Sequence, residues 1–270
     1  TDAPATEPAE SPADEGGDAY GEAMIASLNE AGVRTDGVTV TGACPSGLSN
    51  IQIRDNGGAA QNRIMVIPGA NMALVPDDVA FLEREIARYD MVILQLEIPM
   101  EINEVVARYA RASGVPVMLN PAPAAPLSPG LMQNLTYIAP NEHEAEALTG
   151  VRPEDDASIR RAAALLRQKG ADRVIITLGE VGAALWNGER FLISPAAHCP
   201  QPVDPTAAGD SFIGAFSTAL CAGMAEEDAM AFANHAACLT VSGMGAQPSL
   251  PTLEQVNASL AGAGRKTLHY

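Results

Sequence analysis

The sequence has few basic residues and almost no lysine. Its 270 residues include 33 Asp and Glu against 16 Lys and Arg, which gives a formal net charge of −17. Such a charge repels nucleic-acid phosphates and anionic membrane surfaces, so neither is expected as a partner. Lys169 and Lys266 are its lysines, and neither follows a glycine-rich loop, which excludes a P-loop and the strand lysine of protein kinases. Any bound phosphate must therefore be neutralised by other groups.

Paired cysteines and long apolar runs are also missing. Cys44, Cys199, Cys221 and Cys238 form neither a CxxC pair nor a cysteine–histidine metal spacing, and we interpret them as ordinary thiols of a reducing compartment. No apolar run reaches the length of a membrane span, and no signal-peptide pattern is recognised. Hydrophobic residues make up 47% of the chain, enough for a sizeable core. We expect a globular protein of the cytoplasm.

The composition changes near residue 18. Residues 1–18 contain three prolines, six acidic residues and no basic residue, which predicts a disordered acidic leader. Residues 19–270 are predicted to form one domain. Its first part, after a helix at residues 20–31, contains β-branched runs that predict a small β lid with hairpin strands at about 37–67. The runs are residues 38–41, 49–54 and 64–67, and the last two flank the turn Asp55-Asn56-Gly57-Gly58.

The rest of the sequence alternates helical periodicity with short apolar runs. Helices are predicted at residues 76–88, 100–112, 157–169, 208–223, 226–241 and 252–261. Strands are predicted at residues 91–96, 115–119, 136–138 and 174–176. Strands that are apolar throughout and separated by helices are typical of a parallel sheet covered on both faces. The sequence therefore predicts a three-layer α/β/α fold with a mostly parallel sheet.

Ligands of open α/β sheets bind where strands end and helices begin, so these junctions are the candidate sites. In residues 203–212, small side chains lead into the helix at 208, and backbone N–H groups there can approach an anion closely. Asp210 lies in its first turn. It is either a solvated residue that complements the helix dipole or a general base for a substrate hydroxyl, and local sequence favours neither.

Three further junctions have a structural and a functional interpretation. Asn141 and Glu144 form a capping box by spacing, and they could also hold hydrated Mg²⁺. The structural interpretation of residues 177–182 is a turn between two strands. The functional interpretation is a glycine-lined loop that binds a nucleotide. The structural interpretation of residues 241–249 is the end of a helix followed by a loop. In the functional interpretation, the carbonyls of this loop bind a monovalent cation together with Asp204. Spacing alone favours the structural interpretation in each case.

Seven segments, taken in chain order, resemble the ribokinase branch of the PfkB carbohydrate kinase family. They are residues 65–71 ending in GAN, QLE at 95–97, NPAPA at 120–124, PNEHEAE at 140–146, TLG at 177–179, DPTAAGD at 204–210 and GAQPS at 245–249. Each segment is weak alone, but their order is highly specific. Pro205 stands where the family pattern usually has Thr. The resemblance implies a ribokinase-like fold and ATP-dependent phosphorylation of a sugar, at the 5-hydroxyl of D-ribose.

The same resemblance implies a role for individual residues. Asp210 would be the general base, and the amides of Ala207, Ala208 and Gly209 would form the anion hole. Asn141 would act on phosphate and, with Glu144, organise Mg²⁺ indirectly, while Glu97 and Asp210 would contact the sugar. The implied nucleotide contacts are Asn141, Thr177, Leu178, Gly179, Glu180, Val181, Gly182, Gly209 and Asn234. The implied K⁺ site is formed by Asp204, Thr206, Thr240, Gly243, Gly245 and Ser249.

One departure from the family pattern concerns the sugar. The family begins with a strand that carries a sugar-binding Asp in an N-x-D context, followed by a GGKGAN segment, and neither precedes Gly16-Gly17-Asp18, which resembles the family's GDDxxG segment. We therefore expect an incomplete lid and about half of the family's sugar contacts. The resemblance implies a homodimer, but the missing lid strands argue against one here. The leading hypothesis is an active ribokinase-type enzyme. The alternative is a non-catalytic remnant that binds only nucleotide.

Overall fold

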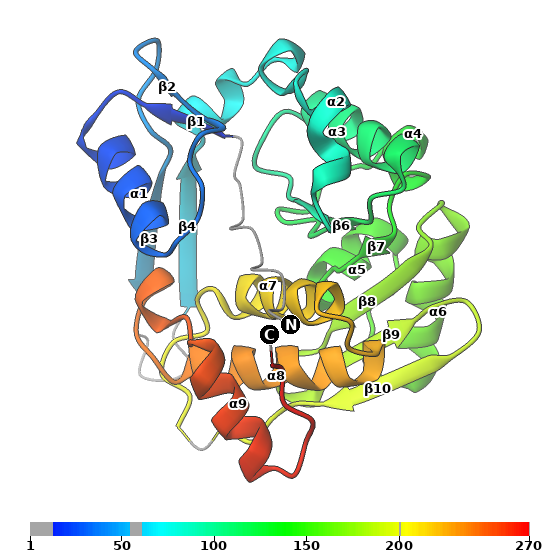
Figure 1. Cartoon of the computed structure of the whole chain (residues 1–270). Coiled ribbons are helices and arrows are strands. Elements are labelled where there is room, and N and C mark those ends of the chain that lie inside the picture. Colours follow the sequence, from blue (N-terminus) through cyan, green and yellow to red (C-terminus); the bar gives the residue numbers. More distant parts are fainter. Residues whose placement is uncertain (1–12, 55–60, 200, 270) are drawn as a thin grey trace, which may run out of the picture. The chain divides into compact units, whose positions relative to one another are not determined.

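The computed structural model describes residues 13–54, 61–199 and 201–269. The chain divides into two compact units, one of Thr1–Glu83 with Glu97–Val106 and the other of Arg84–Leu96 with Ala107–Tyr270 (Figure 1). Within the described residues, none of the helices combines the length and the apolar character that crossing a bilayer requires.

The second unit is built on a six-stranded sheet with the strand order β10-β9-β8-β7-β6-β5. Its strands are β5 (Val92–Leu94), β6 (Val117–Leu119), β7 (Tyr137–Ile138), β8 (Arg173–Thr177), β9 (Gly182–Trp186) and β10 (Phe191–Pro195). Neighbours from β5 to β8 pair in parallel, whereas β8–β9 and β9–β10 pair antiparallel. The carboxyl ends of β5 to β8 therefore meet at one edge of the sheet, which is where an α/β ligand site is expected.

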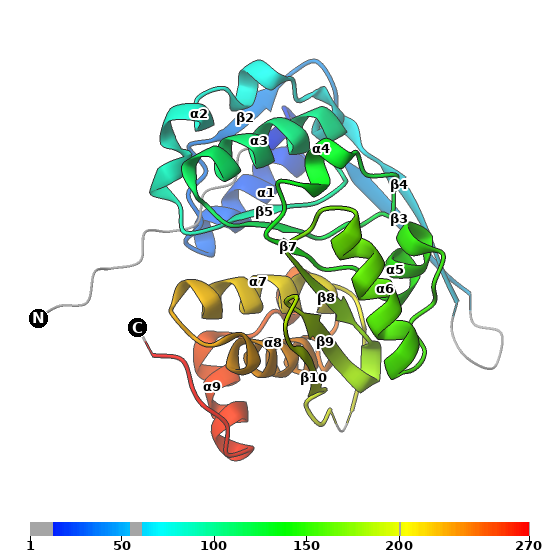
Figure 2. The same cartoon turned by 90° about the vertical axis from the view of Figure 1, so that its right-hand side faces the viewer.

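Both faces of this sheet are covered. Val174, Ile175 and Ile176 of β8 are each fully buried, and because successive strand residues point to opposite faces, neither face is open to solvent there. Figures 1 and 2 show the sheet between α7 and α8 on one side and α5 and α6 on the other. The helix bounds are α5 (Glu142–Thr149), α6 (Asp156–Gln168), α7 (Ala208–Cys221), α8 (Glu226–Val241) and α9 (Leu253–Gly262). The predicted three-layer α/β/α fold is confirmed.

The first unit contains two small sheets. Strand β1 (Ala13–Gly16) pairs in parallel with β2 (Val38–Thr41), and β3 (Leu48–Arg54) pairs antiparallel with β4 (Gln61–Ile67). Helix α1 (Ala19–Glu30) lies between β1 and β2 in the sequence. The predicted hairpin is present as β3 and β4, whose predicted turn lies outside the described residues. β2, however, pairs with β1 and is not part of that hairpin.

A carboxylate at the start of α1 organises the first unit. Asp18 caps the helix by accepting hydrogen bonds from the N–H groups of Tyr20 and Gly21, and it also accepts bonds from the N–H and hydroxyl of Ser46. These donors favour the charged form and lower the pKa of Asp18 to about 2. The bonds to Ser46 join two segments that are 28 residues apart in the sequence.

Two predicted elements differ from the structure, and one strand was missed. Residues 1–12 of the predicted leader lie outside the described residues, but residues 13–18 form β1 and the α1 cap, because β2 and Ser46 supply backbone and side-chain partners that composition does not reveal. The predicted helix at 76–88 is divided into η2 (Pro76–Val79), α2 (Leu82–Glu85) and η3 (Ile86–Arg88). The carboxylate of Asp78 accepts a hydrogen bond from Val75 N–H and so closes a tighter turn. β10 was not predicted.

Of the remaining elements, α3 (Met100–Ser113), α4 (Pro129–Met132) and η4 (Gly179–Val181) lie between strands of the main sheet, η1 (Gly69–Ala73) follows β4, and η5 (Gln247–Ser249) lies between α8 and α9. The predicted helix at residues 100–112 is confirmed by α3, and those at 157–169, 208–223, 226–241 and 252–261 by α6 to α9.

Replacing Gly21 with alanine is expected to destabilise the first unit. A Cβ at Gly21 would lie 2.0 Å from the carbonyl oxygen of Gly16, so the backbone has to move. We expect a loss of about 1–3 kcal/mol in the free energy of unfolding, measured by urea denaturation. Gly42→Ala is the control, because nothing lies within 4 Å of its Cβ position. Alanine is the better helix former, so a Gly21→Ala variant as stable as the parent would contradict this close approach.

Candidate active site

Helix α7 begins at an unusual backbone position. Among the described residues, Ala207 is the one non-glycine residue with a positive φ, at 61°, and it is the N-cap of α7. A left-handed conformation costs an alanine roughly 1–2 kcal/mol, so packing must hold it in place. The N–H of Ala208 donates to the carbonyl of Pro205 at 3.2 Å, so this amide is already engaged within the protein. The anion hole of the Ala207, Ala208 and Gly209 amides stays a prediction.

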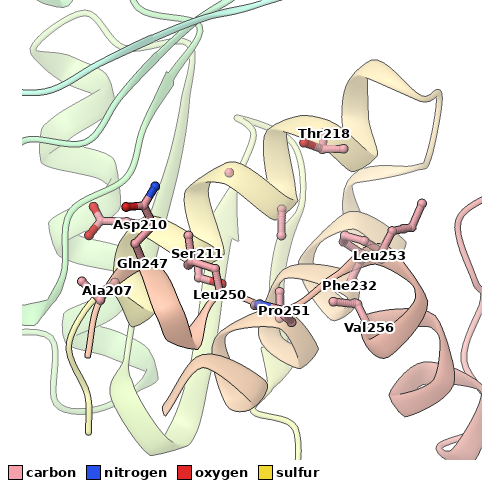
Figure 3. Close-up of a pocket in the computed structure, with 14 residues that line it drawn as sticks. Ala207, Asp210, Ser211, Thr218, Phe232, Gln247, Leu250, Pro251, Leu253 and Val256 are labelled. Carbon is pink, nitrogen blue, oxygen red and sulfur yellow. The ribbon is translucent and has the colours of Figure 1, made fainter. Parts of the chain in front are cut away.

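Asp210 lies exposed in that first turn, beside open space. A Cβ added to the neighbouring Gly209 would meet nothing within 4 Å. Asp210 also lines a pocket of about 460 Å³ on one face of α7, and Figure 3 shows it beside Gln247 at one end of this pocket. The lining comes from α7, α8, residues 246–251 and α9: Ala207, Asp210, Ser211, Gly214, Ala215, Thr218, Phe232, Ala236, Ala246, Gln247, Leu250, Pro251, Leu253 and Val256.

The end of β7 brings a second carboxylate near Asp210. Asn141 caps α5, accepting from Glu144 N–H at 2.9 Å, while the Glu144 carboxylate accepts from Asn141 N–H at 2.9 Å. The predicted capping box is confirmed. Burial of the Glu144 side chain raises its pKa, the bond from Asn141 N–H opposes this, and the negative charge of Asp210 raises it further. The two candidate acids are therefore electrostatic neighbours.

The loop from residue 177 to 182 lies next to Asn141. Thr177 ends β8, and its N–H donates to the carbonyl of Pro140 at 3.0 Å, while Asn141 and Thr177 form a parallel bridge. The loop then passes through η4 into β9, so the predicted turn between two strands is confirmed. Gly182 is required at its end, because a Cβ there would lie 2.1 Å from the carbonyl oxygen of Ser194. Glu180 and Val181 are exposed, and Leu178 is buried.

Asn234 is buried on α8 and already has protein partners. Its side-chain amide lies 3.1 Å from the carbonyl of Ser194, 3.0 Å from the Ser194 hydroxyl and 3.0 Å from the carbonyl of Pro195. Asn234 thus holds the end of β10 against α8, next to Gly182. The sequence analysis missed Ser194 and Pro195 because it missed β10. The short apolar run that ends at a proline was the one sequence feature that could have predicted β10.

Asp204 contacts two of the other five residues of the predicted K⁺ site, Thr206 and Gly245. Its carboxylate accepts from Thr206 N–H at 3.0 Å, from the Thr206 hydroxyl at 2.6 Å and from Gly245 N–H at 2.9 Å. These bonds lower the pKa of Asp204. Gly243 N–H donates to the Thr240 carbonyl, and a Cβ at Gly243 would lie 2.8 Å from Cβ of Ser249, so the loop folds tightly on itself.

Glu97 is the predicted site residue that lies outside the second unit. It is exposed, and it follows the carboxyl end of β5 by three residues. Glu97–Val106 belongs to the first unit. The structure thus brings Asn141, Glu144, the residue 177–182 loop, Asp204 and Asp210 into one unit, and assigns Glu97 to the other.

The proximity of Glu144 and Asp210 can be tested without any ligand. Asp210→Asn removes a negative charge and is expected to lower the pKa of Glu144, because that charge now raises it. A carboxyl ¹³C NMR titration of Glu144 measures the shift. Asp156→Asn, which removes an equivalent first-turn acid from α6, is the control and should leave the Glu144 titration unchanged. Equal titration curves in wild type and Asp210→Asn would show that the two carboxylates are not neighbours.

Known proteins resemble this chain over most of its length. The model of the pfkB family carbohydrate kinases matches residues 16–253. The chain is 37% identical to a ribokinase of Haemophilus influenzae over 241 residues, which covers 89% of this chain and 77% of that protein. It is also 37% identical to a ribokinase of Bacillus subtilis over 246 residues, covering 91% and 79%.

A solved structure of Arabidopsis thaliana ribokinase complexed with ribose and ATP is similar as well, with 32% sequence identity and a TM-score of 0.86. The similarity covers 93% of this chain and 81% of that one. The similarity to this solved structure agrees with the three-layer fold. The chain therefore belongs to the pfkB family of carbohydrate kinases.

Proposed function

We propose that this carbohydrate kinase transfers the γ-phosphoryl group of ATP to the 5-hydroxyl of D-ribose, with Asp210 as the general base. The observation that carries the proposal is the position of Asp210: an exposed carboxylate in the first turn of α7, with open space at Gly209 and a pocket at its side. The relatives named above are ribokinases, and the Arabidopsis structure contains ribose and ATP, which supports the choice of sugar and nucleotide.

The chemical step follows from the two kinds of group at the start of α7. Asp210 accepts the proton of the sugar hydroxyl as the oxygen attacks the γ-phosphorus, and ADP leaves. The N–H groups of the first turn and the helix dipole stabilise the negative charge on the transferring group. This arrangement needs no P-loop lysine. The left-handed Ala207 supports it, because strained backbone held in place by packing is concentrated at functional sites.

Asn141 and Glu144 fit a role in organising Mg²⁺ through its water shell. Mg²⁺ prefers oxygen ligands and keeps several waters, and when bound with ATP it neutralises phosphate charge. Glu144 offers a carboxylate near Asp210, and its capping bond to Asn141 N–H uses only part of its acceptor capacity. The Asn141 side chain fixes the start of α5 and so the direction of Glu144.

The loop of residues 177–182 is proposed to receive the nucleotide. Gly179 and Gly182 both have positive φ, which lets the backbone turn closely after β8, and Asn234 supports the neighbouring end of β10. The Asp204 carboxylate and the carbonyls of the residue 243–249 loop are oxygen donors that suit K⁺, a hard cation. A cation bound there would stabilise the loop beside α7. Glu97 is proposed to contact the sugar.

The first test measures ribose phosphorylation directly. Purified chain with ATP and Mg²⁺ is expected to form ADP in proportion to added ribose, with ribose 5-phosphate identified by ³¹P NMR. Asp210→Asn should lower kcat about 10²- to 10⁴-fold, the usual cost of losing a general base, and should leave ATP affinity nearly unchanged because the phosphate contacts are backbone groups. Asp156→Asn, an exposed first-turn acid of α6, is the matched control and should retain wild-type activity.

The outcomes separate catalysis from binding alone. An Asp210→Asn variant that keeps most of the wild-type kcat would remove Asp210 from the role of base. ATP binding by calorimetry without any ADP formation, with ribose or other sugars, would replace the proposal with a nucleotide-binding protein.

A second prediction concerns the monovalent cation. Replacing Na⁺ by K⁺ at constant ionic strength should raise the activity several-fold, and Asp204→Ala should abolish this difference. Ionic strength has to be fixed because a chain of charge −17 also responds to screening. Equal rates in the two salts for the wild-type chain would contradict a K⁺ site at Asp204.

A further inference from the structure

Two cysteines that are far apart in the sequence lie against each other at the end of α8. The Sγ atom of Cys199 donates to the carbonyl oxygen of Cys238 at 3.5 Å, and the Sγ atom of Cys238 donates to the carbonyl oxygen of His198 at 3.4 Å. The two contacts are reciprocal: each thiol bonds to the backbone at or beside the other cysteine. The pair is 39 residues apart in the sequence, and both thiols are free.

The two side chains also contact each other and are accessible. Burial raises the pKa of Cys238 to about 11, and a hydrogen bond with the Cys199 side chain contributes to this shift. Both residues are only partly buried, so a small solute can reach them. The third neighbour is the Ser242 hydroxyl, 3.3 Å from Sγ of Cys199. The other two cysteines of the chain, Cys44 and Cys221, have no such contact among the described residues.

The pair lies where one connecting segment joins α8. Cys199 follows β10, and the segment after it returns to α8 through two hydrogen bonds, from Val203 N–H and Asp204 N–H, both to the carbonyl of Val241. Cys238 lies on the last turn of α8, three residues before Val241. A covalent bond between the two sulfurs would therefore reinforce a junction that backbone hydrogen bonds already define.

We propose that Cys199 and Cys238 form a redox-sensitive dithiol, whose disulfide fixes the segment leading to Asp204 against the end of α8. Nothing in the kinase chemistry uses these thiols, so the site is independent of the proposed function. Neither a CxxC motif nor any sequence proximity indicates the pair. Asn234 of α8 holds the end of β10, four residues before Cys199, against this helix.

The oxidation is balanced with a small disulfide, such as oxidised glutathione, as the oxidant. One protein thiolate attacks a glutathione sulfur, forms a mixed disulfide and releases one glutathione thiolate. The second protein thiolate then attacks the protein sulfur of this mixed disulfide and releases the second glutathione thiolate. The two protons of the protein thiols end on the two glutathiones. The protein loses two electrons, and oxidised glutathione gains them.

The expected physical effect is local stiffening. Disulfide geometry requires an S–S distance of about 2.05 Å, so the two sulfurs have to move from hydrogen-bonding contact into covalent contact. The bond would close a loop of roughly 40 residues, which reduces the freedom of the unfolded chain and raises the temperature of thermal unfolding by a few degrees. The amides of Val203 and Asp204 should exchange with solvent more slowly in the oxidised form.

The first experiment identifies the bond. The full chain is equilibrated in buffers of defined oxidised-to-reduced glutathione ratio, alkylated and analysed by peptide mass spectrometry. The expected product is one intrachain disulfide between Cys199 and Cys238, which dithiothreitol reverses. Cys199→Ser and Cys238→Ser should each abolish it, whereas Cys44→Ser and Cys221→Ser should retain it. Glutathione adducts on separate cysteines, without the 199–238 bond, would overturn the proposal.

The second experiment tests the fixing of the segment and needs no variant that could misfold. Amide hydrogen exchange is measured by NMR on wild-type chain, oxidised and reduced. Exchange at Val203 and Asp204 should slow at least several-fold on oxidation, while exchange in α6, far from the pair, should not change. A disulfide that forms without any slowing at these two amides would show that it does not hold the segment against α8.

Discussion

The position of the candidate base depends on how α7 is packed. Phe212 and Phe216 lie one turn apart on α7, both buried, with stacked rings 6.2 Å apart. The ring of Tyr137 meets Phe216 edge-on at 5.6 Å. Tyr137 belongs to β7, the strand that leads directly to Asn141, so one aromatic contact connects the helix that carries Asp210 to the strand that carries Asn141 and Glu144. Asp210 therefore cannot move with α7 unless these aromatic contacts in the core are broken.

This packing holds two like charges near each other. The Asp210 charge raises the pKa of Glu144, and burial raises it more, so the pair destabilises the fold when both groups are ionised. The helix dipole offsets part of this at Asp210, and the Asn141 N–H offsets part at Glu144. A chain selected for stability alone would gain by replacing one acid. Under the proposed function, a cation bound with the nucleotide would offset this repulsion.

The sequence predicted local features well and pairings poorly. The cap at Asn141, the start of α7 at Ala208 and the buried strands follow from spacing and residue type, and the structure agrees. Ordered residues 13–18 and β10 were missed because each is stabilised by a distant partner: Ser46 for Asp18, and Asn234 for Ser194. The grouping of Asp204 with Gly245, 41 residues away, came from the family resemblance and could not follow from spacing.

Structural and functional interpretations of a polar residue are not alternatives in this protein. Asp204 shapes its loop through three hydrogen bonds, Glu144 completes a cap, and Asn234 anchors a strand, yet each is also a residue of the proposed site. A carboxylate has capacity for about four hydrogen bonds, so a structural bond leaves room for a ligand. It also fixes the direction of the group before a ligand arrives, which lowers the entropic cost of binding. Removing such a residue changes the fold and the site together, so an isosteric variant, which keeps the shape and removes the charge, separates the two effects.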